Sequence, residues 1–334
     1  MKEHQLIIEG STRSLCEHLT ALHTESGNIF FARFFCKEPS RQSELIRKFL
    51  PKPLLCKVSV IGQKPLSGAE CALWIWLTDK KPSAAYEHHF LTNLTASGND
   101  SEKQMSAIFR NLECNLREKG LGTAEDCVRT WIFVRDIDSN YAGAVKGRRD
   151  WFEEIGLTSK THYIASTGIQ GDSPDADKTV QMDAYCIKGL GKGQQSYLYA
   201  KTHLNPTYEY GVTFERGAAV TYGDRRHIFI SGTASIDNKG EVLFVGDPAA
   251  QAERMLENID MLLREAGAGL KDVTAALVYL RNEQELEPIR KVFGQICPWI
   301  KAVFLKAPVC RPTWLVETEC IVSIPWSTDL YADF

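Results

Sequence analysis

The residues best suited to chemistry in this chain lie at positions 307–320. Prolines bracket a turn that carries Cys310 and Arg311, and a strand pattern follows in which Glu317 and Glu319 project from one face. A guanidinium can hold a carboxylate through two hydrogen bonds, and a carboxyl group can transfer a proton. The pattern therefore indicates a pocket in which Arg311 binds an anionic substrate and Glu317 acts on it.

The same alternation also fits a simpler arrangement. An edge strand with one solvated face places its acidic residues in water and packs Trp314 and Val316 against the protein. Spacing alone leaves the edge strand and the pocket strand as alternatives. They differ in whether the Glu317 side chain is buried.

A second candidate cation lies in a predicted helix at residues 139–155. Arg148 falls on the apolar stripe of this helix with Val145 and Phe152, where a lone guanidinium needs an anionic partner. A ligand carboxylate is one such partner. A structural ion pair, or a rotated helix that leaves Arg148 solvated, are the alternatives.

The elements that position these residues follow from periodicity, which is weakest in the first hundred residues. Runs of apolar residues predict strands at 28–37, 54–63, 71–78, 128–134, 162–167, 180–187, 208–220, 227–232, 273–281 and 302–306. Helical spacing predicts helices at 41–49, 101–119, 139–155, 248–266 and 286–296.

The two halves of the chain repeat. Gln104 matches Gln251, and several later positions match at the same offset. Each copy contains strand pairs and two helices, which predicts an α+β fold in which each domain has a mixed or antiparallel sheet with two helices on one face. A glycine-rich stretch at 189–196 marks the boundary, so we predict domains at residues 1–190 and 191–334.

The repeat also predicts the number of active sites. Aligned by sequence, Asp183 of the first copy falls opposite Glu317, and residues 166–168 fall opposite Cys310 and Arg311. The second copy alone then combines the arginine with the carboxyl group. We expect one active site per chain, in the second domain.

Composition restricts the class of protein. The chain has 334 residues, of which 44% are hydrophobic, and a formal net charge of -3, so no basic surface is expected to attract nucleic acid. The apolar run at 71–77 is too short to span a membrane, and the first residues lack a signal-peptide pattern, so we expect a cytoplasmic protein. Ten scattered cysteines without metal-ligand spacing predict reduced thiols, no metal and no cofactor.

Several motifs resemble the reactive-intermediate deaminases (Rid, YjgF or L-PSP endoribonuclease proteins). They are ISGTASID at 230–237 and the 310–320 stretch. Three more resemble the two-domain chorismatases: RTWIFVRD at 129–136, THYIASTGI at 161–169 and YEYGVTFERG at 208–217. The resemblance spans residues 100–324 and implies two tandem Rid-like (chorismate-mutase-like) domains.

The resemblance to chorismatases implies hydrolysis of the enolpyruvyl ether of chorismate, with release of pyruvate and a dihydroxycyclohexadiene carboxylate or a hydroxybenzoate. Glu317 matches the catalytic glutamate of that family, and Arg311 matches its carboxylate-binding arginine. The pKa of Glu317 then has to be raised for the carboxyl to hold a proton near neutral pH. The substrate-binding residues that we expect are Arg148, Cys310, Tyr210, Thr213, Phe214, Glu215, Arg216, Gly232, Thr233 and Glu319.

Other interpretations stay open. Core packing explains Phe214 equally well, and a buried structural thiol is the ordinary role for Cys310. An imine or enamine deaminase uses the same arginine and acid on a smaller substrate, and a non-catalytic binding protein keeps the pocket without turnover. The expected partner is a small anionic substrate rather than nucleic acid or membrane, and the expected assembly is a homotrimer or a monomeric pseudo-oligomer.

Overall fold

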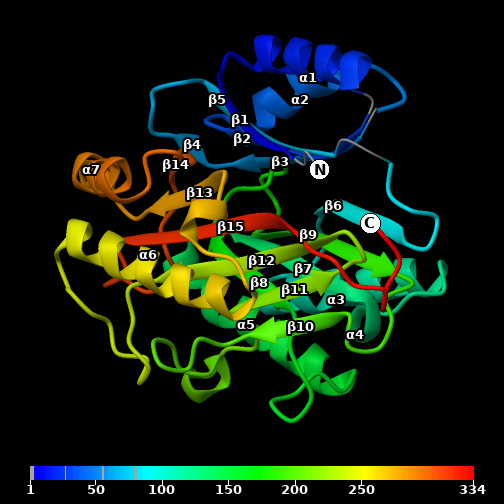
Figure 1. Ribbon diagram of the computed structural model, residues 1–334. Helices are drawn as coiled ribbons and strands as arrows, with labels where there is room; N and C mark the ends of the chain where they lie inside the picture. The colour runs from blue at the N-terminus through cyan, green and yellow to red at the C-terminus, as the bar shows by residue number, and fades with distance from the viewer. Residues whose placement is uncertain (1–3, 27, 55, 79–80) are drawn as a thin grey trace.

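The computed structural model describes residues 4–26, 28–54, 56–78 and 81–334, and one strand order recurs in three consecutive units of this part of the chain (Figure 1). Unit 1 spans residues 4–77, unit 2 spans 87–188 and unit 3 spans 195–325. In each unit the strand before the first long helix pairs with the last strand. The last strand pairs with the strand between the two helices, which runs parallel to the strand after the second helix.

Unit 1 is the copy that the sequence repeat did not reveal. Its elements are β1 (His4–Gly10), α1 (Thr12–Ser26), β2 (Ile29–Cys36), α2 (Pro39–Phe49), β3 (Lys57–Gly62), β4 (Lys64–Pro65) and β5 (Cys71–Leu77). The patterns predicted β2, α2, β3 and β5 but neither β1 nor α1. In α1 the apolar stripe is short, consisting mainly of the buried residues Leu15, Cys16 and Leu19.

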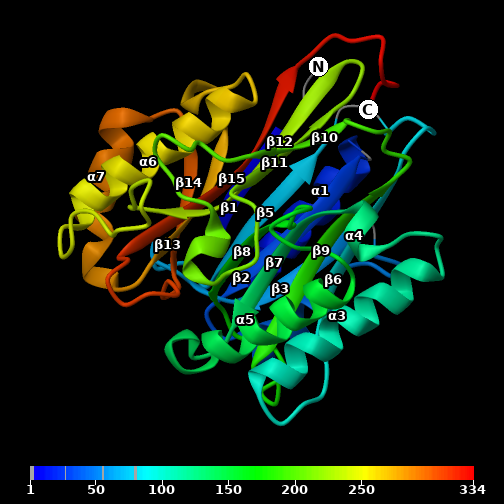
Figure 2. The same ribbon diagram turned by 90° about the horizontal axis from the view of Figure 1, so that it is seen from below.

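Unit 2 packs two long helices side by side on one face of its sheet (Figure 2). Its elements are β6 (Glu87–Leu94), α3 (Ser101–Arg117), α4 (Thr123–Asp126), β7 (Cys127–Val134), α5 (Ile137–Glu154), β8 (Ala165–Gln170) and β9 (Val180–Lys188). Asp100 caps α3 by accepting a hydrogen bond from the Lys103 amide at 2.8 Å, and Gly120 adopts the left-handed conformation after its end, with φ of 69°.

Unit 3 carries the strand with the two glutamates in the interior of a sheet. Its elements are β10 (Gln195–Leu198), η1 (Thr207–Tyr210), β11 (Gly217–Thr221), β12 (Arg225–Ala234), α6 (Pro248–Glu265), η2 (Leu270–Asp272), β13 (Ala275–Leu280), η3 (Glu283–Glu285), α7 (Leu286–Ile296), β14 (Lys301–Lys306) and β15 (Val316–Pro325). Because β15 lies between β12 and β13, the edge-strand interpretation is wrong. Asp247 and Pro248 begin α6 as expected, and the Asp247 side chain accepts from the Ala250 amide.

The α+β class predicted from the sequence is confirmed, with mixed sheets and helices on one face of each. The expected domain boundary between residues 190 and 191 falls in the turn between β9 and β10, and stays a prediction. Residues 1–190 themselves contain two units. Within the described residues, every helix is too short or too polar to cross a membrane.

One predicted strand is wrong. Residues 208–216 were expected to begin a strand, but they form the end of η1 and an irregular segment before β11. Pro206 precedes this segment, and Gly211 within it has φ of 83°, which an extended strand does not allow. The Thr207 hydroxyl donates to the Phe214 carbonyl at 2.5 Å and closes the loop.

The register between the repeats also differs from the sequence alignment. In each unit, one residue of the last strand pairs with the last but one residue of the strand between the helices. This residue is Glu317 in unit 3, Gln181 in unit 2 and Ala72 in unit 1. Asp183 instead corresponds to Glu319. The alignment of Asp183 with Glu317 is therefore wrong by two residues, a shift that keeps the same face of the strand because side chains alternate with period two.

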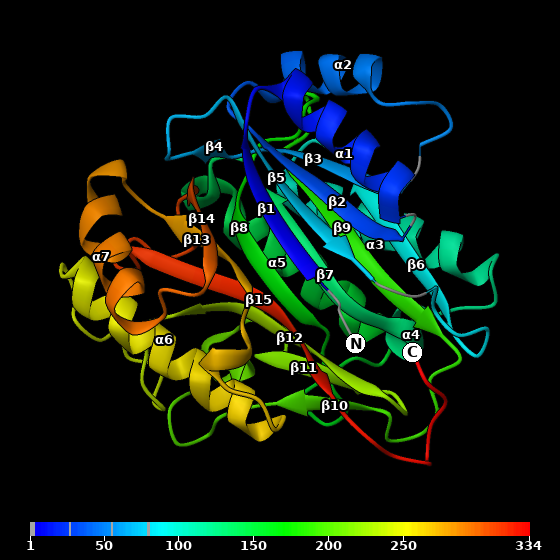
Figure 3. The ribbon, with the colours of Figure 1, turned by 45° about the horizontal axis from the view of Figure 1, so that its top comes forward.

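The three sheets face one central core, while the helix pairs lie outside, with α1 and α2 at the top of Figure 3 and α6 and α7 at the left. Between units 1 and 2 this core contains a buried ion pair. The guanidinium of Arg33 donates to the Asp183 carboxylate at 2.8 Å, and both side chains are almost fully buried. The rings of Trp74 and Trp131 lie 5.4 and 4.7 Å from the guanidinium carbon. The pair therefore joins two units across a dry interface.

Replacing Arg33 by methionine leaves Asp183 as an unpaired buried carboxylate. We expect the free energy of unfolding to fall by about 3–5 kcal/mol, measured by urea denaturation. The control Arg13→Met removes an exposed pair with Glu17, and we expect a change below about 1 kcal/mol. Equal losses in the two variants would contradict the structural role of the Arg33 pair.

Candidate active site

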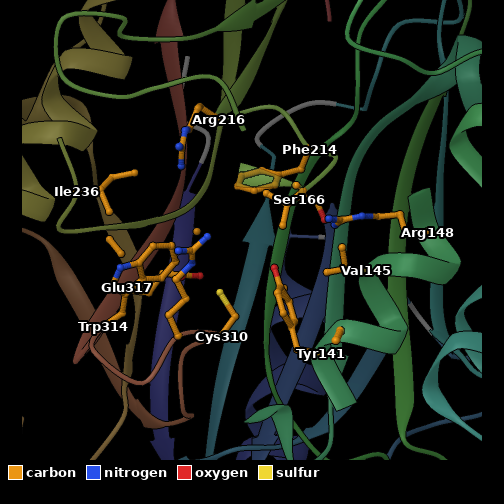
Figure 4. Close-up of a pocket in the computed structure, with 17 residues that line it drawn as sticks. Tyr141, Val145, Arg148, Ser166, Phe214, Arg216, Ile236, Cys310, Trp314 and Glu317 are labelled. Carbon is orange, nitrogen blue, oxygen red and sulfur yellow. The ribbon is translucent and has the colours of Figure 1, made fainter. Parts of the chain in front are cut away.

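A cavity of about 290 Å³ lies between units 2 and 3. Its walls come from α5 and β8 of unit 2, and from β12, the loop before β11 and the loop before β15 in unit 3. Figure 4 shows Tyr141 and Arg148 extending into it from one side, and Trp314 and Glu317 from the other. The cavity thus brings together Arg148, Arg311 and Glu317, which are far apart in the sequence.

Glu317 is the acid of this cavity, and its side chain is shielded from bulk water. The residue is 4% exposed, on a strand with neighbours on both sides. Gly232 makes room for it, because a Cβ atom there would lie 2.0 Å from Glu317 Oε1. Burial, and next the nearby charge of Glu319, raise the pKa of Glu317 to about 8. The carboxyl therefore holds a proton at neutral pH.

Glu319 lies on the same face of β15 as Glu317, but it lies behind the cavity and is fully hydrogen-bonded. Its carboxylate accepts from Thr167 Oγ1 at 2.7 Å and from Trp131 Nε1 at 2.9 Å. The guanidinium of Arg129 and the hydroxyl of Tyr279 also donate to it. These donors fix the position of the Glu319 carboxylate, whereas Glu317 faces the cavity.

Arg148 is buried, as the apolar stripe of its helix predicted. It is 3% exposed, and its Nε donates to Thr213 Oγ1 at 3.1 Å. Its place beside the cavity fits a ligand carboxylate, although the role stays a prediction.

Two further guanidiniums line the cavity from unit 3. The Arg216 guanidinium donates to the Asn205 carbonyl at 3.0 Å and is nearly buried, so its position is fixed. The guanidinium carbon of Arg311 lies 5.3 Å from the centre of the Trp314 ring. Three guanidiniums among the described lining residues, Arg148, Arg216 and Arg311, suit an anionic guest.

The remaining expected site residues divide between the cavity and its surroundings. Phe214, Gly232 and Cys310 line the cavity. Burial raises the pKa of the Cys310 thiol to about 12, so the thiol stays neutral. The side chain of Tyr210 lies outside the described residues.

Four expected residues lie behind the cavity wall rather than on it. Thr213 contacts Arg148, Thr233 Oγ1 donates to the Ser231 carbonyl, and Glu319 binds the donors described above. Glu215 accepts a hydrogen bond from the Tyr163 amide at 2.8 Å on the side away from the cavity. These four residues act on the cavity only through their neighbours.

Other lining residues were not identified from the sequence. They include Tyr141, Ser166, Trp314 and Ile236. Arg129 was also missed as part of the site, although a charged residue in the dense apolar run at 127–134 was a usable signal. For Ser166 there was no signal, because only the packing of β8 against unit 3 makes it a cavity residue.

The chain is similar to several known proteins. A family model described as Endoribonuclease L-PSP matches residues 217–324. The 3-aminoacrylate deaminase RutC of Acinetobacter baylyi is 32% identical over 97 residues, which are 29% of this chain and 74% of RutC. The crystal structure of a chorismatase aligns over 96% of this chain and 98% of its own, with a TM-score of 0.71 and 17% identity. RidA of the Antarctic bacterium Psychrobacter sp. PAMC 21119 aligns over 39% of this chain and 99% of its own, with 23% identity and a TM-score of 0.33.

Gly232→Ala tests the close approach of the Glu317 carboxyl to β12. The added methyl group overlaps Glu317, so we expect the free energy of unfolding to fall by about 1–3 kcal/mol, measured by urea denaturation. The control is Gly294→Ala on α7, where an added Cβ meets nothing within 4 Å. A variant at residue 232 that is as stable as this control would contradict the packing.

Glu319→Gln tests whether the second glutamate sets the protonation of the first. This variant removes the negative charge of Glu319, which raises the pKa of Glu317. The positive charge of Arg129, which lowers that pKa, remains, so the pKa of Glu317 falls from about 8. We expect the titration of the Glu317 carboxyl carbon, followed by carbon-13 NMR, to shift to lower pH. Tyr279→Phe keeps both charges and serves as control. An unchanged or raised midpoint in Glu319→Gln would refute the coupling.

Proposed function

The chain belongs to the endoribonuclease L-PSP family of the YjgF/Rid superfamily, and on this premise we propose that it hydrolyses the enolpyruvyl ether of chorismate. The observation that carries the proposal is a buried, protonated carboxyl, Glu317, in a cavity lined by three guanidiniums. The shared fold with a chorismatase is consistent with it. The products are pyruvate and a dihydroxycyclohexadiene carboxylate, or a hydroxybenzoate where the ring then loses a molecule of water.

The charges of the cavity match those of the substrate. Chorismate carries two carboxylates, one on the ring and one on the enolpyruvyl group. Arg311, on the loop before β15, binds the pyruvyl carboxylate, and Arg148, on α5, binds the ring carboxylate. Two fixed contacts at the ends of the substrate orient the enol ether between them, which lowers the entropic part of the barrier.

The chemistry needs a proton at carbon. Glu317 donates its proton to the terminal methylene carbon, which becomes a methyl group, and the ether carbon becomes an oxocarbenium ion. Water adds to this carbon and gives its proton to the Glu317 carboxylate. The hemiketal then collapses, the ring oxygen leaves as a hydroxyl group, and pyruvate is released.

The raised pKa of Glu317 is the property that this step requires. A carboxyl of ordinary pKa is ionised at neutral pH and cannot act as an acid, whereas a pKa of about 8 keeps Glu317 protonated. The ionised Glu319 behind it contributes to this shift without contacting the substrate. The neutral thiol of Cys310 leaves Glu317 as the acid of the cavity.

Glu317→Gln keeps the shape of the side chain and removes the transferable proton. We expect kcat to fall by about a hundred- to ten-thousand-fold, with an intact fold by circular dichroism. Glu253→Gln changes an exposed carboxylate on α6 and is the matched control. In the unmodified protein, kcat/KM should fall as the pH rises above about 8, because Glu317 then loses its proton. Full activity in Glu317→Gln would end the proposal.

The activity itself is tested by incubating the purified protein with chorismate and measuring pyruvate with lactate dehydrogenase. We expect pyruvate release in the unmodified protein and a raised KM in Arg311→Met, which loses a carboxylate contact. The rise should exceed about tenfold. Absence of pyruvate would exclude chorismate hydrolysis.

A deaminase is the second candidate, supported by the 32% identity over 97 residues to RutC, an enzyme named for 3-aminoacrylate. An enamine acid needs the same arginine-bound carboxylate and the same proton donor. Ammonia release from aminoacrylates without pyruvate release from chorismate would favour this function. Release of neither ammonia from aminoacrylates nor pyruvate from chorismate would indicate a binding protein.

A further inference from the structure

A second cavity occupies the interface between units 1 and 2, in the position that corresponds to the candidate active site between units 2 and 3. Its volume is about 500 Å³, and it lies between α2 and β3 of unit 1 and β6, β9 and the loop before β9 of unit 2. The corresponding elements of the active site are α5, β8, β12, β15 and the loop before β15. A buried arginine–carboxylate pair lies behind both, Arg33 with Asp183 here and Arg129 with Glu319 there; the carboxylates share a register position, and the arginines are two residues apart.

Strand register fixes which residues correspond. Gln181 takes the place of Glu317, since each pairs with the penultimate residue of the neighbouring strand. Asp175 lies as many residues before Gln181 as Arg311 lies before Glu317, so Asp175 takes the place of Arg311. The strand irregularities at 91–94 and 230–233 correspond as well, which places Asn93 where the active site has Gly232.

This second cavity has lost the proton donor. The amide of Gln181 donates to the Val60 carbonyl at 2.9 Å and to Asn93 Oδ1 at 3.3 Å, so it joins β9, β6 and β3. An amide cannot transfer a proton as a carboxyl does. The cavity can bind a molecule but lacks the means for acid chemistry on it.

The charges around the second cavity differ from those of the active site. One guanidinium, Arg47, and two carboxylates, Glu44 and Asp175, line its rim. Apolar side chains form its inner wall, where β3 presents Val58 and Val60 in place of Ser166 and Gly168 of β8, and α2 adds Ile46 and Leu50. A dianion is disfavoured by the two carboxylates, whereas a molecule with one positive and one negative end satisfies both signs.

We propose that the cavity between units 1 and 2 is a non-catalytic binding site for an α-amino acid with an apolar side chain. The carboxylate of the ligand contacts Arg47, its ammonium group contacts Asp175, and its side chain lies against the wall formed by Val58, Val60 and Leu50. Hydroxyl groups of Ser43 and Ser173 lie at the polar end. The inference rests on the repeat and not on the proposed hydrolase activity.

The third interface of the same kind, between units 3 and 1, supports the distinction. There β4 pairs with β14, and Lys64 forms a salt bridge with Glu283 at 2.9 Å, which covers the corresponding position. Ala72 takes the place of Glu317. Among the described residues, the interface between units 3 and 1 is therefore closed by a strand. The interface between units 2 and 3 has a cavity with Glu317, and the interface between units 1 and 2 has a cavity with Gln181 in its place.

Isothermal titration calorimetry with L-leucine and L-phenylalanine tests the site on the full-length protein. We expect saturable binding of one molecule per chain, weakened about tenfold or more in Arg47→Gln and in Asp175→Asn. Lys48→Gln, an exposed change on the same helix outside the cavity, should alter affinity less than about twofold. Arg311→Met, which changes the other cavity, should also leave this binding intact.

Benzoate, which has a carboxylate and an apolar body but no ammonium group, is the matched probe. We expect it to bind at least about tenfold more weakly than L-phenylalanine. Benzoate binding of equal strength would overturn the amino-acid assignment. Absence of saturable binding, indifference to Arg47→Gln, or loss of binding in Arg311→Met would overturn the site.

Discussion

Two carboxylates on one face of a buried central strand are the constraint on which this structure depends. Glu317 and Glu319 are each less than 5% exposed, and two ionised carboxylates so close together in a dry interior repel strongly. Arg129 and three neutral donors form hydrogen bonds to Glu319. Glu317 faces a cavity instead and keeps its proton. The negative charge of Glu319 therefore contributes to the raised pKa of Glu317.

The three units share one architecture, but the interfaces between them differ in the residues that they present. Each contributes a sheet to the central core and a helix pair to the surface, so the interfaces between units are related by the repeat. Glu317, Gln181 and Ala72 occupy the same register position at these interfaces. The side chain at that position is a carboxyl at one interface, an amide at the second and a methyl group at the third. Fold alone therefore says little about chemistry, which depends on the residues at the site.

Much of unit 3 was predictable because its signals are local. The Asp247 cap, the apolar stripe of α6 and the strand at 316–325 depend on near neighbours in the chain. The burial of Arg148 was predictable for the same reason, from its place on a helical stripe. The segment at 208–216 was not, since its conformation depends on Gly211 and on contacts with the cavity wall rather than on its alternating pattern.

The sequence by itself determined the α+β class and the repeat, and it indicated an arginine and a carboxyl near residues 311–317 and an arginine on the apolar stripe of α5. Tertiary structure decided which of the two glutamates is held by buried donors, because Arg129, Trp131 and Thr167 reach Glu319 only when β7 and β8 pack against β15. It also decided the true register between units, and it revealed unit 1 and its cavity with unit 2. Burial and long-range contacts set pKa values and form cavities, and neither quantity is encoded in local spacing.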